Sequence, residues 1–124
     1  MKIGVIGGAG WLGQAIAKAL LRSAISTPSD LILSYRSRKA EEISGVHWTT
    51  DNQFLADHCD IIILSVRPED WKTLKFDAKE KLVISVMAGI KLDALIKAHN
   101  TQRVVRALPN AAAEFQQSFT PWFA

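Results

Sequence analysis

A cluster of glycines near the amino terminus is the first part of the sequence that can do chemistry. The segment Gly8 to Gly13 fits the pattern G-x-G-x-x-G and stands between an apolar stretch and a helical pattern. In that context the glycines allow a tight turn, bring the backbone close to a pyrophosphate and let the next helix pack against the strand. The helix then offers unpaired N–H groups to the phosphates. The sequence therefore predicts a dinucleotide-binding turn.

Two glycine patterns fit this turn, and they differ in its length. Gly7, Gly10 and Gly13 also fit a G-x-x-G-x-x-G pattern, in which the turn is one residue longer. Both patterns bind dinucleotide phosphates. A nucleoside triphosphate loop is excluded, because Gln14 and Ala15 follow Gly13 where that loop requires Lys and then Ser or Thr. The sequence thus argues against a kinase or an ATPase.

A second polar cluster, Tyr35-Arg36-Ser37, ends the next apolar stretch. NAD-binding domains place Asp or Glu at this point to bond the ribose 2′-hydroxyl, whereas Asp30 stands at the opposite end of the stretch. A guanidinium pairs with a phosphate in a bidentate geometry, and a serine hydroxyl adds a donor. Arg36 and Ser37 therefore predict a 2′-phosphate site, and NADP(H) as the cofactor in preference to NAD(H).

The histidines and the cysteine offer no comparable chemistry. His58 and Cys59 are neighbours that point in different directions on a helix, and no second cluster stands at ligand spacing. We therefore predict no metal site and a core position for Cys59. His47 and His99 are isolated and are expected to be exposed, and no order of Ser, His and Asp supports hydrolysis.

The hydrophobic pattern supplies the elements that must position these clusters. The run from Ile61 to Leu64 is apolar on both faces, as a central parallel strand requires. Asp51 is expected to cap a helix at 52–58, and Pro68 to open another. Further helices are predicted at 12–24, 38–43 and 92–99, and strands at 2–6, 31–35, 46–49, 60–66, 82–86 and 103–108. This alternation predicts an α/β fold, a Rossmann-like doubly wound parallel sheet with helices on both faces.

Length and composition limit what surrounds this sheet. The 124 residues, 48% of them hydrophobic and 22% charged, fit a single domain over 1–124. The net charge of +3 is interspersed, which predicts no nucleic-acid partner, and no apolar run is long enough for a membrane span. A single cysteine favours the cytoplasm. Ligands of such sheets bind beyond the carboxyl ends of the strands, so function is expected in the loops there.

Across residues 1 to about 110, the motifs resemble, in order, the amino-terminal domain of the pyrroline-5-carboxylate reductase family. The segments that carry the resemblance are 5–13, 35–37, 50–52, 63–68, 82–90 and 104–110. Members of this family use NADPH or NADH to reduce a cyclic imine to proline. The resemblance therefore implies an NADP-dependent oxidoreductase of proline biosynthesis.

The resemblance also implies which residues hold the cofactor. Those implied for the pyrophosphate are Gly8, Ala9, Gly10, Trp11 and Leu12. Those implied for the adenosine end are Arg36, Ser37 and, on the adenine side, Asn52. Those implied for the nicotinamide half are Val66, Arg67, Met87, Ala88 and Asn110. The resemblance covers only the amino-terminal domain of the family. The family's helical second domain makes the dimer and supplies most of the imine-binding and proton-donating groups, so we expect no catalytic residue among those assigned here.

The sequence departs from the family at the glycine turn and after Asn110. Trp11 replaces a small polar residue, and it either stacks on the cofactor or blocks its site. Beyond Asn110 the family continues with Thr-Pro and a glycine-rich stretch, whereas this chain has Ala111 to Ala113 and then Glu and Phe. Residues 118–124 predict a strand that either completes the sheet or leads into another domain. Its aromatic side chains favour self-association, as in a homodimer.

Two other functions fit the same residues. One is a stand-alone module that binds NADP(H) without chemistry, and the other is a related reductase that uses a deazaflavin or another carbonyl substrate, as the turn from Gly7 to Gly10 suggests. For an imine reductase we expect tight cofactor binding but little or no turnover unless a separate catalytic domain or partner joins this one.

Overall fold

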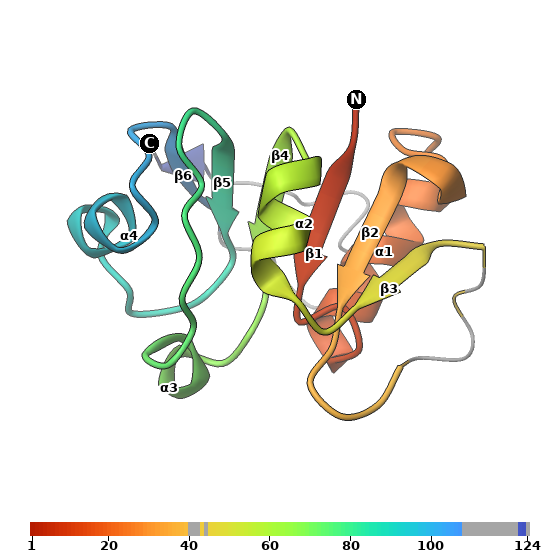
Figure 1. The fold of residues 1–124 in the computed structure, drawn as a ribbon, viewed down its shortest axis with the longest axis horizontal. Coiled ribbons are helices and arrows are strands. Elements are labelled where there is room, and N and C mark those ends of the chain that lie inside the picture. The colour runs from red at the N-terminus through yellow and green to blue at the C-terminus, as the bar shows by residue number, and fades with distance from the viewer. Residues whose placement is uncertain (40–42, 44, 108–121, 124) are drawn as a thin grey trace.

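The structure, a computed structural model, describes residues 1–39, 43, 45–107 and 122–123. A seven-stranded sheet runs through it in the order β3-β2-β1-β4-β5-β6-β7 (Figure 1). The strands are β1 Ile3–Ile6, β2 Leu31–Ser34, β3 His47–Thr49, β4 Ile61–Leu64, β5 Leu82–Ser85, β6 Val104–Ala107 and β7 Trp122–Phe123. The helices are α1 Trp11–Arg22, the short 3₁₀ helix η1 Pro28–Asp30, α2 Asn52–His58, α3 Pro68–Trp71 and α4 Leu92–His99.

The strand order confirms the predicted fold class. Strands β1 to β6 are all parallel, and the chain moves outward from β1 to β3 before it returns to β4 on the other side of β1. The gap between β1 and β4 is therefore the point at which the winding reverses, which is where Rossmann-like sheets bind ligands. Among the described strands, β7 is the exception to the parallel arrangement, since it pairs antiparallel with β6 at the sheet edge.

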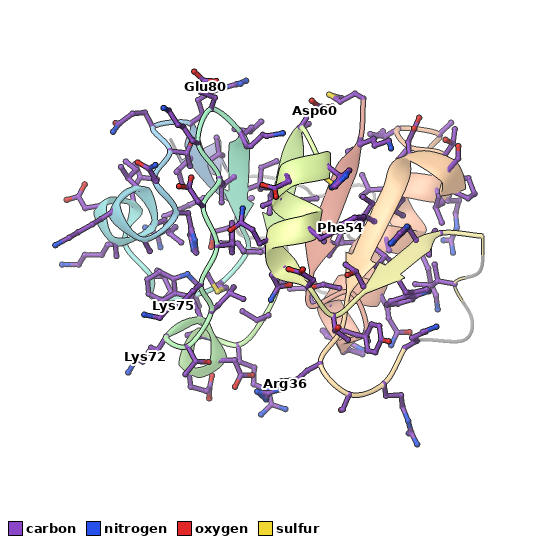
Figure 2. All side chains as sticks on the ribbon, in the orientation of Figure 1. Arg36, Phe54, Asp60, Lys72, Lys75 and Glu80 are labelled. Carbon is purple, nitrogen blue, oxygen red and sulfur yellow. The ribbon has the colours of Figure 1, made fainter. Side chains whose placement is uncertain are left out.

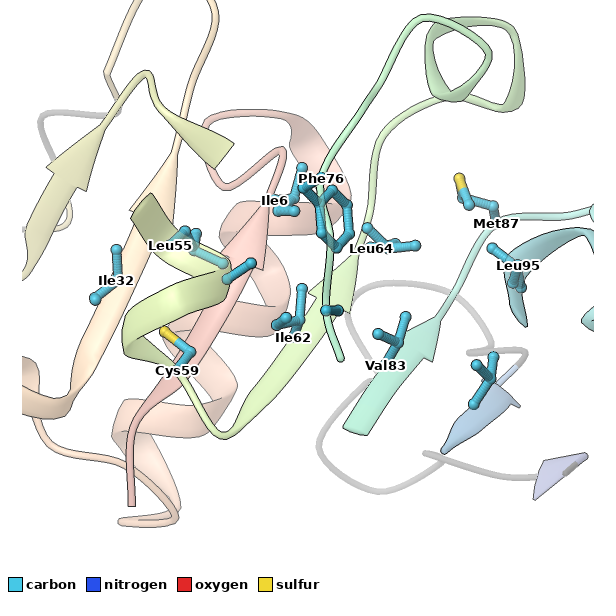
Figure 3. Close-up of a cluster of buried hydrophobic side chains, with 13 residues drawn as sticks. Ile6, Ile32, Leu55, Cys59, Ile62, Leu64, Phe76, Val83, Met87 and Leu95 are labelled. Atoms are coloured by element: carbon cyan, nitrogen blue, oxygen red, sulfur yellow. The ribbon is translucent and has the colours of Figure 1, made fainter. Parts of the chain in front are cut away.

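Each face of the sheet has its own hydrophobic core. In β4, Ile63 contributes to the core beneath α1, and Ile62 and Leu64 contribute to the core beneath α2 and α4. The second cluster, shown in Figure 3, also contains Cys59, which is fully buried. Burial on both faces is thus the reason for the uninterrupted apolar run, and the predicted core position of Cys59 is confirmed.

Local contacts explain where α2 begins and how close it lies to the sheet. The carboxylate of Asp51 accepts hydrogen bonds from the amides of Gln53 and Phe54, at 3.0 and 3.1 Å, so Asp51 is the predicted cap. A Cβ at Gly4 in β1 would run into the Leu55 side chain and lie 2.9 Å from the Cys59 sulfur. Glycine at this position lets α2 pack directly onto β1.

Two predicted elements differ from the structure or extend beyond the described residues. Of the helix predicted at 38–43, the described residues 38, 39 and 43 are not helical. Ile43 is instead buried in a core, and its carbonyl accepts a hydrogen bond from the Trp48 indole at 3.2 Å. Of the strand predicted at 118–124, Trp122–Phe123 forms β7, and the other residues lie outside the described part of the chain.

The exposed position predicted for His99 is wrong. His99 is the last residue of α4. Its imidazole is fully buried and stacks on the Phe76 ring, with the ring centroids 4.0 Å apart. The Trp71 indole donates to its Nε2 at 2.9 Å. A polar residue at a helix end gave no sign of this burial, because the contacts come from a segment more than twenty residues earlier. Among the described helices, none is long and apolar enough to cross a membrane.

Candidate functional site

A cleft of about 750 Å³ opens beyond the carboxyl ends of the central strands. Its walls come from the glycine turn after β1, the loop after β2, the start of α2, the β4–α3 connection and the end of β5. These are the loops in which the sequence predicted function. The cleft also lies at the reversal point between β1 and β4, so the fold and the predicted motifs agree on its place.

The structure selects the longer of the two registers for the glycine turn. Gly7 has φ +88°, a conformation that favours glycine, and its carbonyl accepts a hydrogen bond from the Gly10 amide at 3.1 Å. A Cβ at Gly13 would run into that same carbonyl. Gly7 therefore makes the tight turn and Gly13 permits the close approach of α1, as in the G-x-x-G-x-x-G pattern.

Gly8 has a different environment from the one implied for it. It is buried, it does not line the cleft, and its amide donates to the Ser34 carbonyl of β2 at 2.8 Å. A Cβ at this position would lie 2.8 Å from the Cβ of Leu33. Because this amide already has an acceptor, Gly8 supports the turn from behind and is not free to bond a phosphate.

The first turn of α1 faces the cleft from the residues after Gly8. Ala9, Gly10, Trp11 and Leu12 all line it, and helix geometry leaves amides of this first turn without intrahelical acceptors. The Gln14 side chain donates to the Ala9 carbonyl at 2.8 Å and braces the turn. Trp11 is 76% exposed at the rim, so its indole does not fill the cleft.

The loop after β2 brings a cation to one end of the cleft. Arg36 lines it with its side chain 80% exposed, and the guanidinium approaches the Asp70 carboxylate of α3 at 3.7 Å. Figure 2 shows the Arg36 side chain between this loop and α3. Ser37 is exposed but does not line the cleft, so the structure does not bring its hydroxyl together with Arg36 as predicted.

Asn52 gives the same end of the cleft an unused hydrogen-bond acceptor. The residue begins α2 and lines the cleft, and its Oδ1 is buried with no hydrogen-bond partner among the described residues. A buried acceptor without a donor costs free energy. The amino group of an adenine base is a donor of the kind that this oxygen lacks, so the site fits the adenine side that was implied for Asn52.

The end of the cleft that follows β4 and β5 is lined by Val66, Met87 and Ala88, and by Arg67, whose carbonyl accepts from the Asp70 amide. The Met87 amide donates to the Ser85 hydroxyl at 3.3 Å, which holds the backbone just after β5. Ala88 is exposed, so this end is open to water. Asn110, the last residue implied for this region, lies outside the described part of the chain.

Two residues that shape the cleft were not singled out from the sequence. Ser34, at the end of β2, accepts from the Gly7 amide through its hydroxyl at 3.2 Å and from the Gly8 amide through its carbonyl. Asp70 reaches Arg36 from α3. The sequence did contain a signal for Ser34, namely a hydroxyl residue at the end of the strand that lies beside the glycine turn. For Asp70 the sequence contained no such signal, because its partner Arg36 is 34 residues away.

This arrangement can bind an extended, anionic nucleotide. It combines amides at a helix amino terminus, a guanidinium, a buried acceptor and apolar side chains such as Val66 and Met87 along one cleft. The described residues contain no group of three or more His, Cys, Asp or Glu side chains that would hold a metal ion.

The sequence is similar to a known protein family and to curated enzymes. The family described as NADP oxidoreductase, coenzyme F420-dependent, matches residues 2–89. A curated pyrroline-5-carboxylate reductase from Methanosarcina acetivorans is 35% identical over 130 aligned positions, which cover 94% of this chain and 47% of the relative. Pyrroline-5-carboxylate reductase 2 from Bacillus subtilis is 30% identical, with 96% and 46% covered. The chain thus spans about half the length of the curated relatives that it matches.

Solved structures show the same similarity. Pyrroline-5-carboxylate reductase from Streptococcus pyogenes superposes with a TM-score of 0.72 at 34% identity, covering 95% of this chain and 46% of that one. The Plasmodium falciparum enzyme, solved with NADP bound, has a TM-score of 0.70 at 25% identity, with 89% and 42% covered. The resemblance inferred from the motifs is therefore confirmed, and it lies in the first part of those chains.

Proposed function

The chain belongs to the family described as NADP oxidoreductase, coenzyme F420-dependent, and from this premise we propose that residues 1–124 are an NADP(H)-binding domain. The observation that carries the proposal is the single cleft that joins the amide-lined turn at α1 to the Arg36 guanidinium. A pyrophosphate and a 2′-phosphate are the anionic parts of NADP(H), and this cleft offers a separate donor group for each.

The turn and the first residues of α1 would hold the pyrophosphate. Ala9, Gly10, Trp11 and Leu12 line this part of the cleft. The amides of the first turn of α1, together with the partial positive charge of the helix amino terminus, favour a phosphate there. The Gly10 amide instead donates to the Gly7 carbonyl and shapes the turn. Gly8 would act indirectly, because its hydrogen bond to β2 keeps the turn in place.

Arg36 and Asn52 would hold the adenosine end. The guanidinium is charged and exposed, which suits a phosphate that arrives from solvent, and the Asn52 oxygen lacks a donor. Ser37 stands next to Arg36 on an exposed loop, and its predicted phosphate contact requires that loop to move. No Asp or Glu follows β2 directly, which is the position that binds a ribose 2′-hydroxyl in NAD-specific domains.

The nicotinamide half would lie along Val66, Arg67, Met87 and Ala88, with Asn110 as a further predicted contact. NADPH bound there supplies a hydride to its substrate. The chain's own contribution is to orient the ring: Ser85 holds the Met87 amide, and the Ser65 hydroxyl donates to the Ile6 carbonyl at 3.0 Å, so the strand ends around this region are held rigidly.

We propose that the substrate of the complete enzyme is a cyclic imine of the pyrroline-5-carboxylate type. The support is the similarity to proteins of that name in both sequence and structure. Those proteins are about twice as long as the part matched here, so imine binding, proton donation and dimer formation are assigned to the remainder of such an enzyme or to a partner. A homodimer and a cytoplasmic location stay predictions.

A deazaflavin substrate is the second candidate, because the matching family is described as coenzyme F420-dependent. The two reactions are separated by supplying NADPH with either pyrroline-5-carboxylate or coenzyme F420 and following NADPH oxidation. The imine proposal expects oxidation with the imine in a complete enzyme that carries this domain. Oxidation with coenzyme F420 alone would favour the second candidate.

The cofactor proposal is tested by titrating the 124-residue chain with NADPH and with NADH. Binding is followed by quenching of tryptophan fluorescence, to which the exposed Trp11 contributes, and independently by calorimetry. We expect Arg36→Ala to weaken NADPH binding by about ten- to a hundredfold, which is the usual loss for one charged hydrogen bond. NADH binding should not change, because NADH has no 2′-phosphate.

Arg38→Ala is the matched control for this titration. Arg38 is also an exposed arginine of the loop after β2, but it does not line the cleft. Equal losses of NADPH binding in both variants would assign the effect to general positive charge. Absence of binding of either nucleotide to the wild-type chain would overturn the proposal.

A further inference from the structure

The cleft contains an acidic side chain at the end where the phosphate-binding cation lies. Asp70 of α3 lines the cleft and approaches the Arg36 guanidinium, with Oδ1 and Nη2 separated by 3.7 Å. The two residues belong to opposite walls, one to the loop after β2 and the other to the helix after β4 (Figures 1 and 2). The pair therefore joins the two walls at the adenosine end of the cleft.

The ion pair is one that a phosphate can displace. Its side chains are 80% and 39% exposed, and exposed ion pairs contribute little to stability in water. A phosphate monoester carries up to two negative charges and accepts bidentate hydrogen bonds from a guanidinium, so it attracts Arg36 more strongly than one carboxylate does.

Asp70 is held in place more firmly than Arg36. Its amide donates to the Arg67 carbonyl at 2.9 Å, and its carbonyl accepts from the Thr73 hydroxyl at 3.1 Å. Arg36 extends from an exposed loop on a long flexible stem. When a phosphate takes over the guanidinium, the backbone of Asp70 therefore stays where it is, and its carboxylate remains beside the incoming charge.

We propose that Asp70 competes with the cofactor 2′-phosphate for Arg36 and so limits the preference of the cleft for NADP(H) over NAD(H). The inference rests on the proposed function, since it requires Arg36 to bind the 2′-phosphate. The carboxylate opposes NADP(H) because the phosphate must first separate the ion pair. NAD(H) leaves the pair intact, so it has no such cost.

The test is the binding of 2′,5′-ADP and 5′-AMP, two fragments that differ only in the 2′-phosphate. Asp70→Asn should tighten 2′,5′-ADP and NADPH by about two- to fivefold, as expected for the loss of one exposed ion pair. Binding of 5′-AMP and NADH should stay within error. Glu69→Gln is the matched control, because Glu69 is the neighbouring acidic residue of α3 but does not line the cleft.

A second pair of variants asks whether Asp70 acts through Arg36. In the Arg36→Ala background, Asp70→Asn should tighten 2′,5′-ADP by clearly less than it does in the wild-type background, because there is no guanidinium left to release. The gain should also shrink as salt is raised, since both charges are exposed.

The outcomes separate this inference from the proposed function. If wild-type NADPH binding depends on Arg36 but Asp70→Asn leaves it unchanged or weakens it, the cofactor proposal stands and the competition is wrong. Weaker binding would mean that Asp70 positions Arg36 for the phosphate. An equal gain for 2′,5′-ADP and 5′-AMP, or an equal gain in Glu69→Gln, would also overturn the competition. If no fragment binds to any variant, both proposals fall.

Discussion

His99 is a buried imidazole with both ring nitrogens in hydrogen bonds. The Phe76 carbonyl can only accept, so Nδ1, 3.2 Å away, carries the proton, and Nε2 accepts from the Trp71 indole. Desolvation lowers the pKa of His99 below its ordinary value of 6.5, although the Phe76 carbonyl opposes the shift. A proton on Nε2 would also remove the acceptor of the Trp71 indole. The neutral ring thus links the end of α4 to the end of α3.

This lowered pKa predicts a loss of stability in mild acid. Well above pH 6.5 the imidazole is neutral in both the folded and the unfolded chain. As the pH falls below that value the unfolded chain takes up a proton that the folded chain resists, so the free energy of unfolding decreases until the folded-state pKa is passed. The decrease is at most about 1.4 kcal/mol per pH unit for one proton. Urea unfolding at a series of pH values measures it.

The variant that isolates this effect is His99→Gln, which can donate and accept hydrogen bonds but does not titrate. We expect lower stability at neutral pH, and a flatter dependence on pH below 6.5 than in the wild-type chain. His47→Gln is the control, because it replaces an exposed histidine in another part of the fold. A wild-type slope in His99→Gln would assign the acid sensitivity to other groups.

At the scale of the element, the unit formed by β1, the glycine turn and α1 depends on the distance between the helix and the turn. A Cβ at Gly13 would meet the Gly7 carbonyl oxygen, with the Gly7 carbonyl carbon at 2.8 Å and the Gly8 Cα at 2.9 Å. All of these are backbone atoms, so they cannot move aside as a side chain would. Gly13 is therefore required by packing, independently of any ligand.

We expect Gly13→Ala to lower the free energy of unfolding by about 1–3 kcal/mol, the usual cost of overpacking, despite the better helix propensity of alanine. Chemical denaturation provides the measurement. Gly10→Ala is the matched control: the same methyl group would lie 3.4 Å from the Gly7 oxygen, and Gly10 has φ −74°, which alanine adopts freely. Gly13→Ala with wild-type stability would mean that α1 does not approach the turn this closely.

At the scale of the whole molecule, the cleft is open where chemistry would take place. Ala88 and Gly89 are exposed at the end proposed for the nicotinamide, and the matched relatives are about twice as long as this chain. Hydride transfer to an imine needs a proton donor and a site from which water is excluded. The described residues of this chain provide the cofactor-binding side of such a site. We assign the exclusion of water and the proton donor to another domain or partner.

We therefore predict that the 124-residue chain binds NADPH but reduces pyrroline-5-carboxylate slowly. The rate should be about 10²–10⁴-fold below that of a full-length relative, which is the usual contribution of a positioned general acid. Steady-state NADPH oxidation at nanomolar enzyme is the measurement, with the Bacillus subtilis reductase as the reference. Comparable rates would show that this chain already contains the catalytic groups.

Much of the fold could be predicted because its signals are local. The run Ile61 to Leu64, the cap at Asp51 and the glycine spacing each depend on residues close in sequence, and they predicted the strands, the start of α2 and the place of the cleft. The helix predicted at 38–43 is wrong at the described residues 38, 39 and 43, since Ile43 is instead placed in a core through contacts with β3.

The sequence by itself determined the alternation of strands and helices, the class of ligand and the place of Arg36 after the second strand, because periodicity and residue type depend on near neighbours. Asn52 was implied by the family resemblance. Only the tertiary structure decided the register of the turn, the burial of His99 and the pairing of Arg36 with Asp70. Each of these depends on groups brought together from separate elements by the packing of helices on the sheet, and no local pattern specifies such a meeting.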